Sequence, residues 1–224
     1  MSDASVPDVP ARRYVRIFVC VVGLFVVQAS VGEGEVARLV QGVLAGGALV
    51  LAAQLESGHP RLLRAVWIVA GVSLVLACAQ LADGDRAVTG GGMLLLNGLL
   101  VAAGPVLIFD SIRRHPEVSL RTVIGAITIY VLLGLFFAFV YRSVLLFDAG
   151  SFTTSSGSLS PAAMQYFSFV TLTTVGFGDI TAVSNGARTL VALEALIGQV
   201  YLVTVVALVV GNLGRRRVPG DAAD

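Results

Sequence analysis

The feature that most constrains this chain is a series of apolar segments of similar length, separated by short breaks. A helix that crosses the hydrocarbon core of a membrane needs about 20 predominantly apolar residues. The breaks contain charged or helix-stopping residues, as in the stretches GEGE, ESGHPR, DGDR and RRHPE. We therefore predict an all-α integral membrane protein with six spanning helices, at Val15–Val31, Val36–Leu55, Leu62–Leu81, Ala87–Phe109, Leu120–Tyr141 and Arg188–Leu213.

The composition agrees with a membrane protein and argues against other classes. Hydrophobic residues make up 56% of the chain and charged residues 13%, whereas soluble domains carry about 25% charged residues. The net charge of +1 gives no reason to expect nucleic acid as a partner. The sequence has no phosphate-binding loop, metal-ligand cluster or catalytic triad, so we expect neither an enzyme nor a cofactor. Cys20 and Cys78 lie in apolar segments, where packing is expected rather than a disulfide.

The placement of arginine predicts the orientation in the membrane. With the N-terminus in the cytoplasm, eleven arginines fall on the inner side and four on the outer side, as the positive-inside rule requires. Six spans return the C-terminus to the cytoplasm, which predicts a multi-pass protein of the cell inner (plasma) membrane in contact with lipids. The inner arginines are Arg12, Arg13, Arg16, Arg61, Arg64, Arg113, Arg114, Arg121, Arg215, Arg216 and Arg217.

The first apolar segment has a second interpretation. The stretch RRYVRIFVCVVGLFVVQAS combines a basic start, a short apolar core and small residues near its end, as a cleaved signal peptide does. Cleavage would leave the orientation of the remaining spans unchanged. The charge pattern therefore does not decide between a signal peptide and a first span.

A further apolar segment, Pro161–Thr173, is too short to cross the membrane. Ser160 is suited to cap a helix that begins at Pro161. Because the neighbouring spans place both ends of this segment outside, we predict a re-entrant helix that enters from the outer side. Irregular backbone at membrane depth is tolerated only where protein buries it or water lines it. The residues that return from this helix are therefore expected to have a function.

These returning residues have the properties of a strand that binds ions. Gly176 and Gly178 stand at alternate positions and permit backbone torsions that other residues resist. Successive carbonyl groups can then face one side and replace the hydration shell of an ion, and the Thr174 hydroxyl can add an oxygen at the inner end. Val175 and Phe177 are expected to point away from the ion path. The partial negative charge at the C-terminal end of the short helix favours a cation.

The stretch TTVGFGD resembles the selectivity filter of potassium channels, the tetrameric pore-loop cation channels. The surrounding FSFVTLTTVGFGDIT and ARTLVALEALIGQVYLV are similar to the pore helix and inner helix of bacterial members. The resemblance is specific over Leu120–Leu213 and weak before it. It implies a homotetramer in which the carbonyls of Thr174, Val175, Gly176 and Phe177 bind K⁺. Gly178 completes the implied filter, Asp179 lies at its mouth, and Thr173, Tyr166 and Phe167 support it.

The filter departs from the commoner pattern at two places. Phe177 replaces tyrosine and so removes a hydroxyl that can tie the filter to the pore helix, which puts the stability of the filter in doubt. Tyr166 and Phe167 stand where the family often has tryptophans, so their bracing role is expected to use different hydrogen bonds.

Two residues of the last span have alternative interpretations. Glu194 is either a structural carboxyl bonded to Ser168 or Thr171, which is the interpretation we favour, or a direct influence on the pore. Gly198 lies at mid-helix, where many family members have a hinge, but glycine also serves close helix packing. His59 and His115 are expected to be surface residues, and Gly42, Gly46 and Gly47 to serve helix contacts.

The chain is predicted to form a four-helix module at 1–115, a pore module at 116–217 and a short cytoplasmic tail at 218–224. Voltage sensors carry several arginines inside a span, and Ala87–Phe109 has none. The tail is too short for a soluble ligand-binding domain. The expected function is a passive K⁺ channel of prokaryotic type, with K⁺ as its only ligand. A weakly selective cation channel and a non-conducting structural or regulatory membrane protein are the alternatives.

Overall fold

The computed structural model describes residues 11–30, 120–155 and 157–215, together with single positions at 64, 68, 71, 98, 101, 102 and 105. The predicted spans Val36–Leu55, Leu62–Leu81 and Ala87–Phe109 lie outside the described residues apart from those helical positions, as do Cys78, His59, His115 and the three glycines at 42, 46 and 47. The described elements are α1 (Ala11–Ser30), α5 (Leu120–Phe147), β1 (Phe152–Thr154), α6 (Pro161–Leu172), β2 (Ile180–Ala182) and α7 (Asn185–Arg215).

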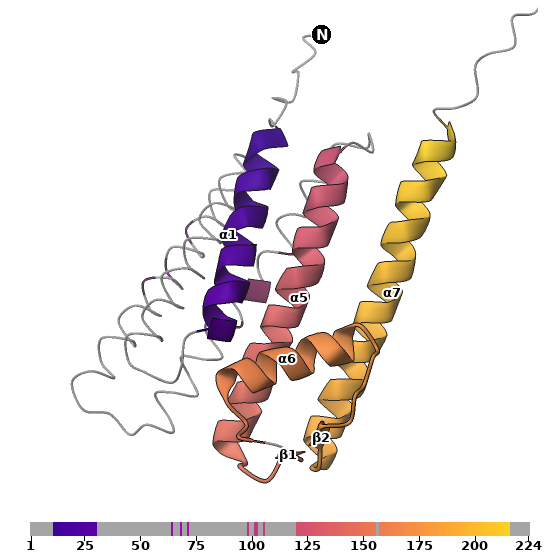
Figure 1. Cartoon of the computed structure of the whole chain (residues 1–224). Helices are drawn as coiled ribbons and strands as arrows, with labels where there is room; N and C mark the ends of the chain where they lie inside the picture. Colours follow the sequence, from indigo (N-terminus) through magenta and orange to yellow (C-terminus); the bar gives the residue numbers. More distant parts are fainter. Residues whose placement is uncertain are drawn as a thin grey trace, which may run out of the picture.

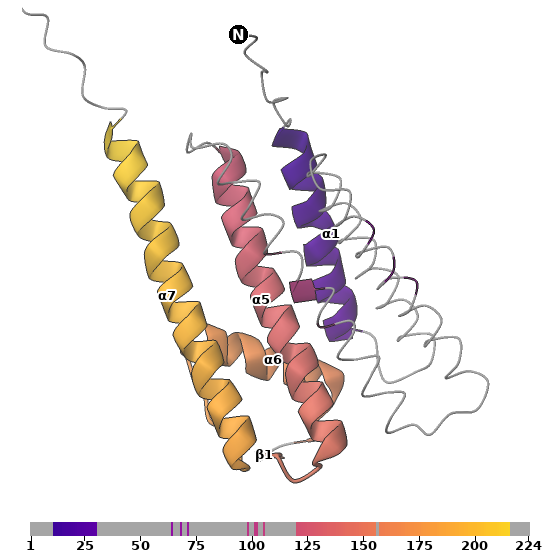
Figure 2. The same cartoon turned by 180° about the vertical axis from the view of Figure 1, so that it is seen from behind.

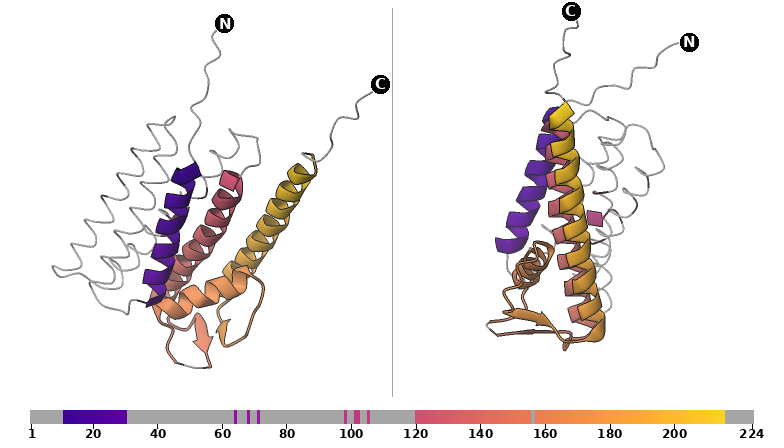
Figure 3. Two further views of the ribbon diagram at one scale, coloured as in Figure 1. Left: turned by 45° about the horizontal axis from the view of Figure 1, so that its top comes forward. Right: turned by 90° about the vertical axis from the view of Figure 1, so that its right-hand side faces the viewer.

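Three long helices run side by side, with α5 between α1 and α7 (Figures 1 and 2). The short helix α6 lies across one end of this group and contacts all three (Figure 1). Below α6, the strands β1 and β2 form a small ribbon (Figure 3). The first residue of α1 and the last residue of α7 lie at the end of the bundle away from this ribbon (Figure 1).

Within the described residues, two helical stretches are long and apolar enough to cross a membrane, Thr122–Phe147 and Asn185–Leu208. The apolar part of α1, Tyr14–Ser30, is shorter. The prediction placed the end of the first of these spans at Tyr141, but α5 continues to Phe147 because the first helix-breaking residues come after it, in Asp148-Ala149-Gly150. At its end the Gly150 N–H donates to the Asp148 carboxylate at 3.1 Å.

The start of α7 also differs from the prediction by three residues. The helix begins at Asn185 rather than at Arg188. The Ser184 hydroxyl accepts from the Ala187 N–H at 3.3 Å and thus satisfies one of the free donors of the first turn. Arg188 is therefore already inside the helix, and its Nε donates to the Ala182 carbonyl at 3.2 Å.

The boundaries of α6 agree with the prediction to within one residue. Ser160 has extended torsions, and its hydroxyl accepts from the Ala163 N–H at 3.2 Å. Pro161 occupies the first helical position, where its missing N–H costs nothing. The helix ends at Leu172 and Thr173 is its C-terminal cap. Local cap signals are thus sufficient to define this helix.

The ribbon of β1 and β2 was not predicted. The strands pair antiparallel, with Phe152 opposite Ala182, Thr153 opposite Thr181 and Thr154 opposite Ile180. The Val183 N–H donates to the Ser151 carbonyl at 2.8 Å at one end of the ribbon. The short runs FTT and ITA contain the aromatic and β-branched residues that strands prefer. Their polar neighbours made the sequence resemble loops instead.

Two buried clusters hold these elements together. The first joins α1 to α5, and its α1 residues recur at helical spacing, while Val15, Val19, Val22 and Val26 on the outer face of α1 are exposed. An exposed apolar face of this kind suits a helix in lipid. The second cluster joins the ribbon, α5, α6 and the start of α7, and comprises Phe137, Tyr141, Phe152, Met164, Phe167, Ile180 and Ala187.

Candidate functional site

The irregular segment Thr174–Gly178, which pairs with neither β1 nor β2 and is called the strand below, leaves the C-terminal end of α6 and remains hydrogen-bonded to it. The N–H groups of Val175 and Gly176 both donate to the Val170 carbonyl, at 2.9 and 3.4 Å. The N–H of Thr174 donates to the Thr171 carbonyl at 2.9 Å. Two of the last carbonyls of α6, those of Val170 and Thr171, are thereby satisfied by the strand.

These bonds fix the direction of two carbonyl groups. In a planar trans peptide the C=O points opposite to the N–H of the following residue. The N–H groups of Val175 and Gly176 point to α6, so the carbonyls of Thr174 and Val175 point away from it. The strand therefore has a donor side that faces α6 and an acceptor side that faces outward.

The backbone torsions of the strand alternate. Thr174, Gly176 and Gly178 have positive φ values of 57°, 59° and 79°. The intervening residues do not have positive φ. Glycine adopts left-handed torsions freely, but a non-glycine residue there carries strain of about 1–3 kcal/mol, which is usually found at functional sites. The glycine positions were predicted to have this freedom, whereas the left-handed Thr174 was not anticipated.

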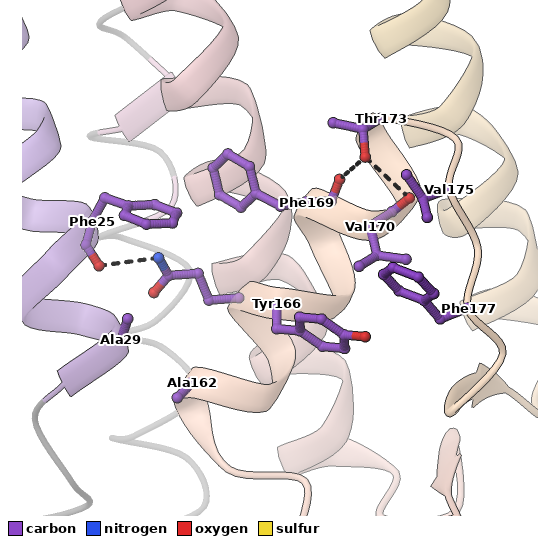
Figure 4. Close-up of a pocket in the computed structure, with 10 residues that line it drawn as sticks. Phe25, Ala29, Ala162, Tyr166, Phe169, Val170, Thr173, Val175 and Phe177 are labelled. Carbon is purple, nitrogen blue, oxygen red and sulfur yellow. Dashed lines mark hydrogen bonds between the residues drawn. The ribbon is translucent and has the colours of Figure 1, made fainter.

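The strand is exposed along its whole length in a single chain. The side chains of Val175 and Phe177 point from the strand towards α6 (Figure 4), as expected from the sequence. Phe177 stacks on Tyr166 with ring centroids 6.3 Å apart and planes only 3° from parallel. A cavity of about 320 Å³ lies between α6, the strand and Phe25 of α1 (Figure 4).

The two aromatic residues predicted to support the strand point in different directions. Tyr166 faces the strand, and partial burial, together with hydrogen bonding to the Asp179 carboxylate, raises the pKa of its phenol. Phe167 is buried instead, with ring centroids 5.3 Å from Tyr141 and 5.7 Å from Phe152. Tyr166 thus contacts the strand directly, while Phe167 fixes α6 to α5 and the ribbon.

The ribbon holds the outer end of the strand. The Asp179 carbonyl accepts from the Ser155 N–H at 2.9 Å, and the Asp179 carboxylate accepts from the Ile180 N–H at 3.0 Å. At the inner end, Thr173 is exposed and its hydroxyl donates to the Phe169 carbonyl at 2.6 Å. Both ends of the strand are therefore anchored to the same chain.

Residues 123–214 match a family described as ion channel. The matched segment begins in α5, includes α6 and the strand, and ends within α7. The match supports a pore-loop cation channel, and together with the two apolar spans it supports a membrane protein. Residues 1–122 lie outside the match. Comparison with curated proteins and with solved structures gave no match.

The two residues of α7 that the sequence singled out, Glu194 and Gly198, both contact α6. Glu194 is fully buried, and its carboxyl contacts the hydroxyls of Ser168 and Tyr141. Ser168 was one of the two partners expected from the sequence, whereas Tyr141 was not expected. Gly198 faces the end of α6, where an added Cβ would lie 2.6 Å from the Leu172 carbonyl oxygen. Gly198 therefore permits a close approach of α7 and α6.

Helix α1 contributes to the surroundings of the site, which no local signal in the sequence indicated. The Phe25 carbonyl accepts from Gln165 Nε2 at 3.1 Å. The Phe25 ring meets Phe169 edge to face, with centroids 5.0 Å apart. Within the described part of the chain there is no group of three or more histidine, cysteine or acidic residues that could hold a metal ion.

Proposed function

We propose that this chain is the subunit of a homotetrameric K⁺-selective channel, and that Thr174–Gly178 is its selectivity filter. The observation that carries the proposal is the combination of alternating left-handed torsions with N–H groups that donate back to Val170. This combination directs carbonyl oxygens to one side, where they can replace the hydration shell of K⁺. Side-chain carboxylates are not needed for such a site.

A single chain supplies one quarter of each ring of oxygens, so the pore requires four copies around one axis. Two observations support this assembly. The strand Thr174–Gly178 is exposed in the single chain, and α7 presents an apolar face that the chain itself leaves uncovered. The exposed apolar residues of that face include Leu193, Leu196, Ile197, Val200, Val203 and Val206.

The direction of α6 supports cation rather than anion passage. The C-terminal end of a helix carries a partial negative charge equivalent to about half an electron. This end of α6 leads directly into Thr173 and the inner end of the filter. Four such ends would stabilise a cation in the central cavity below the filter.

The six-span layout with both termini in the cytoplasm belongs to the same proposal. The shared position of the start of α1 and the end of α7 (Figure 1) agrees with it. We further propose that residues 1–115 form a four-helix module without gating charges, located in the plasma membrane.

The test is cation flux into liposomes that contain the purified protein. We expect K⁺ and Rb⁺ to enter and Na⁺ to be excluded. Gly176→Ala should abolish K⁺ flux, because an added Cβ opposes the left-handed torsion by about 1–2 kcal/mol in every subunit. Within the single chain a Cβ at this position meets no other atom of the described residues within 4 Å, so the expected effect does not come from a clash within the subunit.

Gly186→Ala is the matched control, because Gly186 lies in the first turn of α7 with open space around it and no positive φ. It should leave flux unchanged. Equal entry of Na⁺ and K⁺ would favour a weakly selective cation channel. Absence of any flux from correctly assembled tetramers would favour a structural or regulatory membrane protein.

A further inference from the structure

A buried polar cluster joins the three helices around the filter but does not touch the filter itself. It consists of Glu194 from α7, Ser168 from α6 and Tyr141 from α5, and all three side chains have no exposed surface. A charged or polar group in such a position is stable only when its hydrogen bonds are complete. The number of protons in the cluster can therefore be deduced from its contacts.

The cluster contains three oxygen-to-oxygen contacts in a row. Ser168 Oγ lies 2.7 Å from the Gly134 carbonyl oxygen and 2.5 Å from Glu194 Oε1. Glu194 Oε2 contacts the Tyr141 hydroxyl. All are hydrogen-bond contacts, and two oxygens at such a distance repel each other unless a proton lies between them.

Three contacts require three protons. Ser168 and Tyr141 supply one proton each, and the Gly134 carbonyl has none to give. The Ser168 hydroxyl cannot donate to Gly134 and to Glu194 at the same time. The series is complete when Tyr141 donates to Glu194, Glu194 donates to Ser168, and Ser168 donates to Gly134.

We propose that Glu194 is a neutral, protonated positioning residue that fixes α6 against α5 and α7 and so holds the filter in its conducting geometry. The effect on the filter rests on the proposed channel function. The protonation of Glu194 follows from its contacts and does not depend on conduction. Glu194 would thus act through Ser168 rather than by contact with the permeant ion.

The route from this cluster to the filter is short. Ser168 is followed on α6 by Phe169, whose ring lies directly against Gly134. The next residue, Val170, provides the carbonyl that accepts from the N–H groups of Val175 and Gly176. A shift of Ser168 therefore moves the acceptor that sets the direction of the filter peptides.

Among the described residues, no cationic side chain is found that would keep Glu194 ionised. The titratable groups that face it among the described residues are Tyr141, in direct contact, and Tyr130, both from α5. From α6 it meets Ser168, which does not titrate. Loss of the Glu194 proton would leave one of the three contacts without a donor, and it would bury the negative charge of Glu194 without a neighbouring cation. We therefore expect this series of hydrogen bonds to break in alkaline solution.

The first test measures protonation directly. Infrared spectra of the purified tetramer in nanodiscs should contain the carbonyl band of a protonated carboxylic acid near neutral pH, and this band should be absent from Glu194→Gln. An unchanged spectrum in that variant would show that Glu194 is ionised and would overturn the inference. The infrared measurement tests the protonation of Glu194 even if the protein does not conduct ions.

The second test compares Glu194→Gln with Glu194→Leu in K⁺ flux and in the K⁺-to-Na⁺ permeability ratio. Glutamine can accept from Tyr141 and donate to Ser168, so it should retain both quantities within about twofold. Leucine leaves Ser168 and Tyr141 without a partner and should lower them by about tenfold. If the leucine variant does not assemble, Ser168→Ala, which breaks the series at one point, should give the same loss in an assembled tetramer. A glutamine variant as impaired as the leucine variant would contradict the proposal.

Discussion

The ring of Phe169 lies so close to the backbone of Gly134 that a Cβ added to this glycine would be 2.5 Å from the ring. The contact brings α6 against α5 at the level where Ser168 donates to the Gly134 carbonyl. Glycine is therefore required at this position by close packing and not by a special torsion.

We predict that Gly134→Ala displaces α6 from α5. The Phe169 ring would have to move to make room for a methyl group, and overpacking of this kind costs about 1–3 kcal/mol. Thermal unfolding of the purified assembly should move to lower temperature, and flux should fall. Gly23→Ala in α1, where a Cβ meets no atom of the described residues within 4 Å, is the control and should not lower stability. Equal behaviour of the two variants would contradict the contact.

Gly198→Ala separates the packing and hinge interpretations of this residue. An added Cβ would lie 2.6 Å from the Leu172 carbonyl oxygen, which belongs to the backbone and cannot rotate away. We expect lower thermal stability of the assembly, with Gly186→Ala as the unaffected control. Normal stability combined with altered opening in single-channel recordings would support a hinge instead.

Tyr166→Phe removes the phenol that bonds to Asp179 but keeps the ring that stacks on Phe177. The raised pKa keeps this phenol protonated, and so able to donate, above the pH range of an ordinary tyrosine. The variant leaves the Asp179 carboxylate at the outer end of the strand without this donor. K⁺ currents should therefore decay several times faster during sustained activity, and tetramer assembly should be unchanged. Currents identical to those of the unmodified protein would show that stacking alone supports the filter.

The start of α6 offers a separate test of its cap. Ser160→Ala removes the acceptor for the Ala163 N–H and should lower the free energy of unfolding by about 1 kcal/mol. Ser158→Ala, at an exposed position just before the helix, should change it little. Chemical denaturation in detergent compares the two, and equal midpoints would exclude the cap as a source of stability.

The parts of the site that could be predicted depend on local signals. Ser160 and Pro161 identify the start of α6, and the spacing of Gly176 and Gly178 identifies the strand with unusual torsions. Each of these signals lies within a few residues of the structure that it determines. The left-handed Thr174 was missed because its torsion is imposed by the bonds between the strand and α6, not by its own preference.

The parts that could not be predicted bring together distant residues. Tyr141 and Glu194 are separated by 53 positions, and Phe25 and Gln165 by 140. The ribbon pairs two strands of three residues each, which are too short to show an alternating pattern. Helix α1 carries valines on its exposed face as well as apolar residues on its buried face, so its sequence does not indicate which residues meet α6.

The ribbon of β1 and β2 makes the segment between its strands a closed loop. Helix α6 and the strand Thr174–Gly178 both lie within this loop. The chain length between β1 and β2 therefore determines how freely α6 and Thr174–Gly178 can be displaced together. Doubling the length of a flexible loop costs only about 0.6 kcal/mol of closure entropy. The exposed turn at Gly157, with its φ of 78°, lies in the chain between β1 and α6 and not between α6 and β2. An engineered binding loop or a label can therefore be inserted there without changing the length of chain that runs from α6 through the filter to β2.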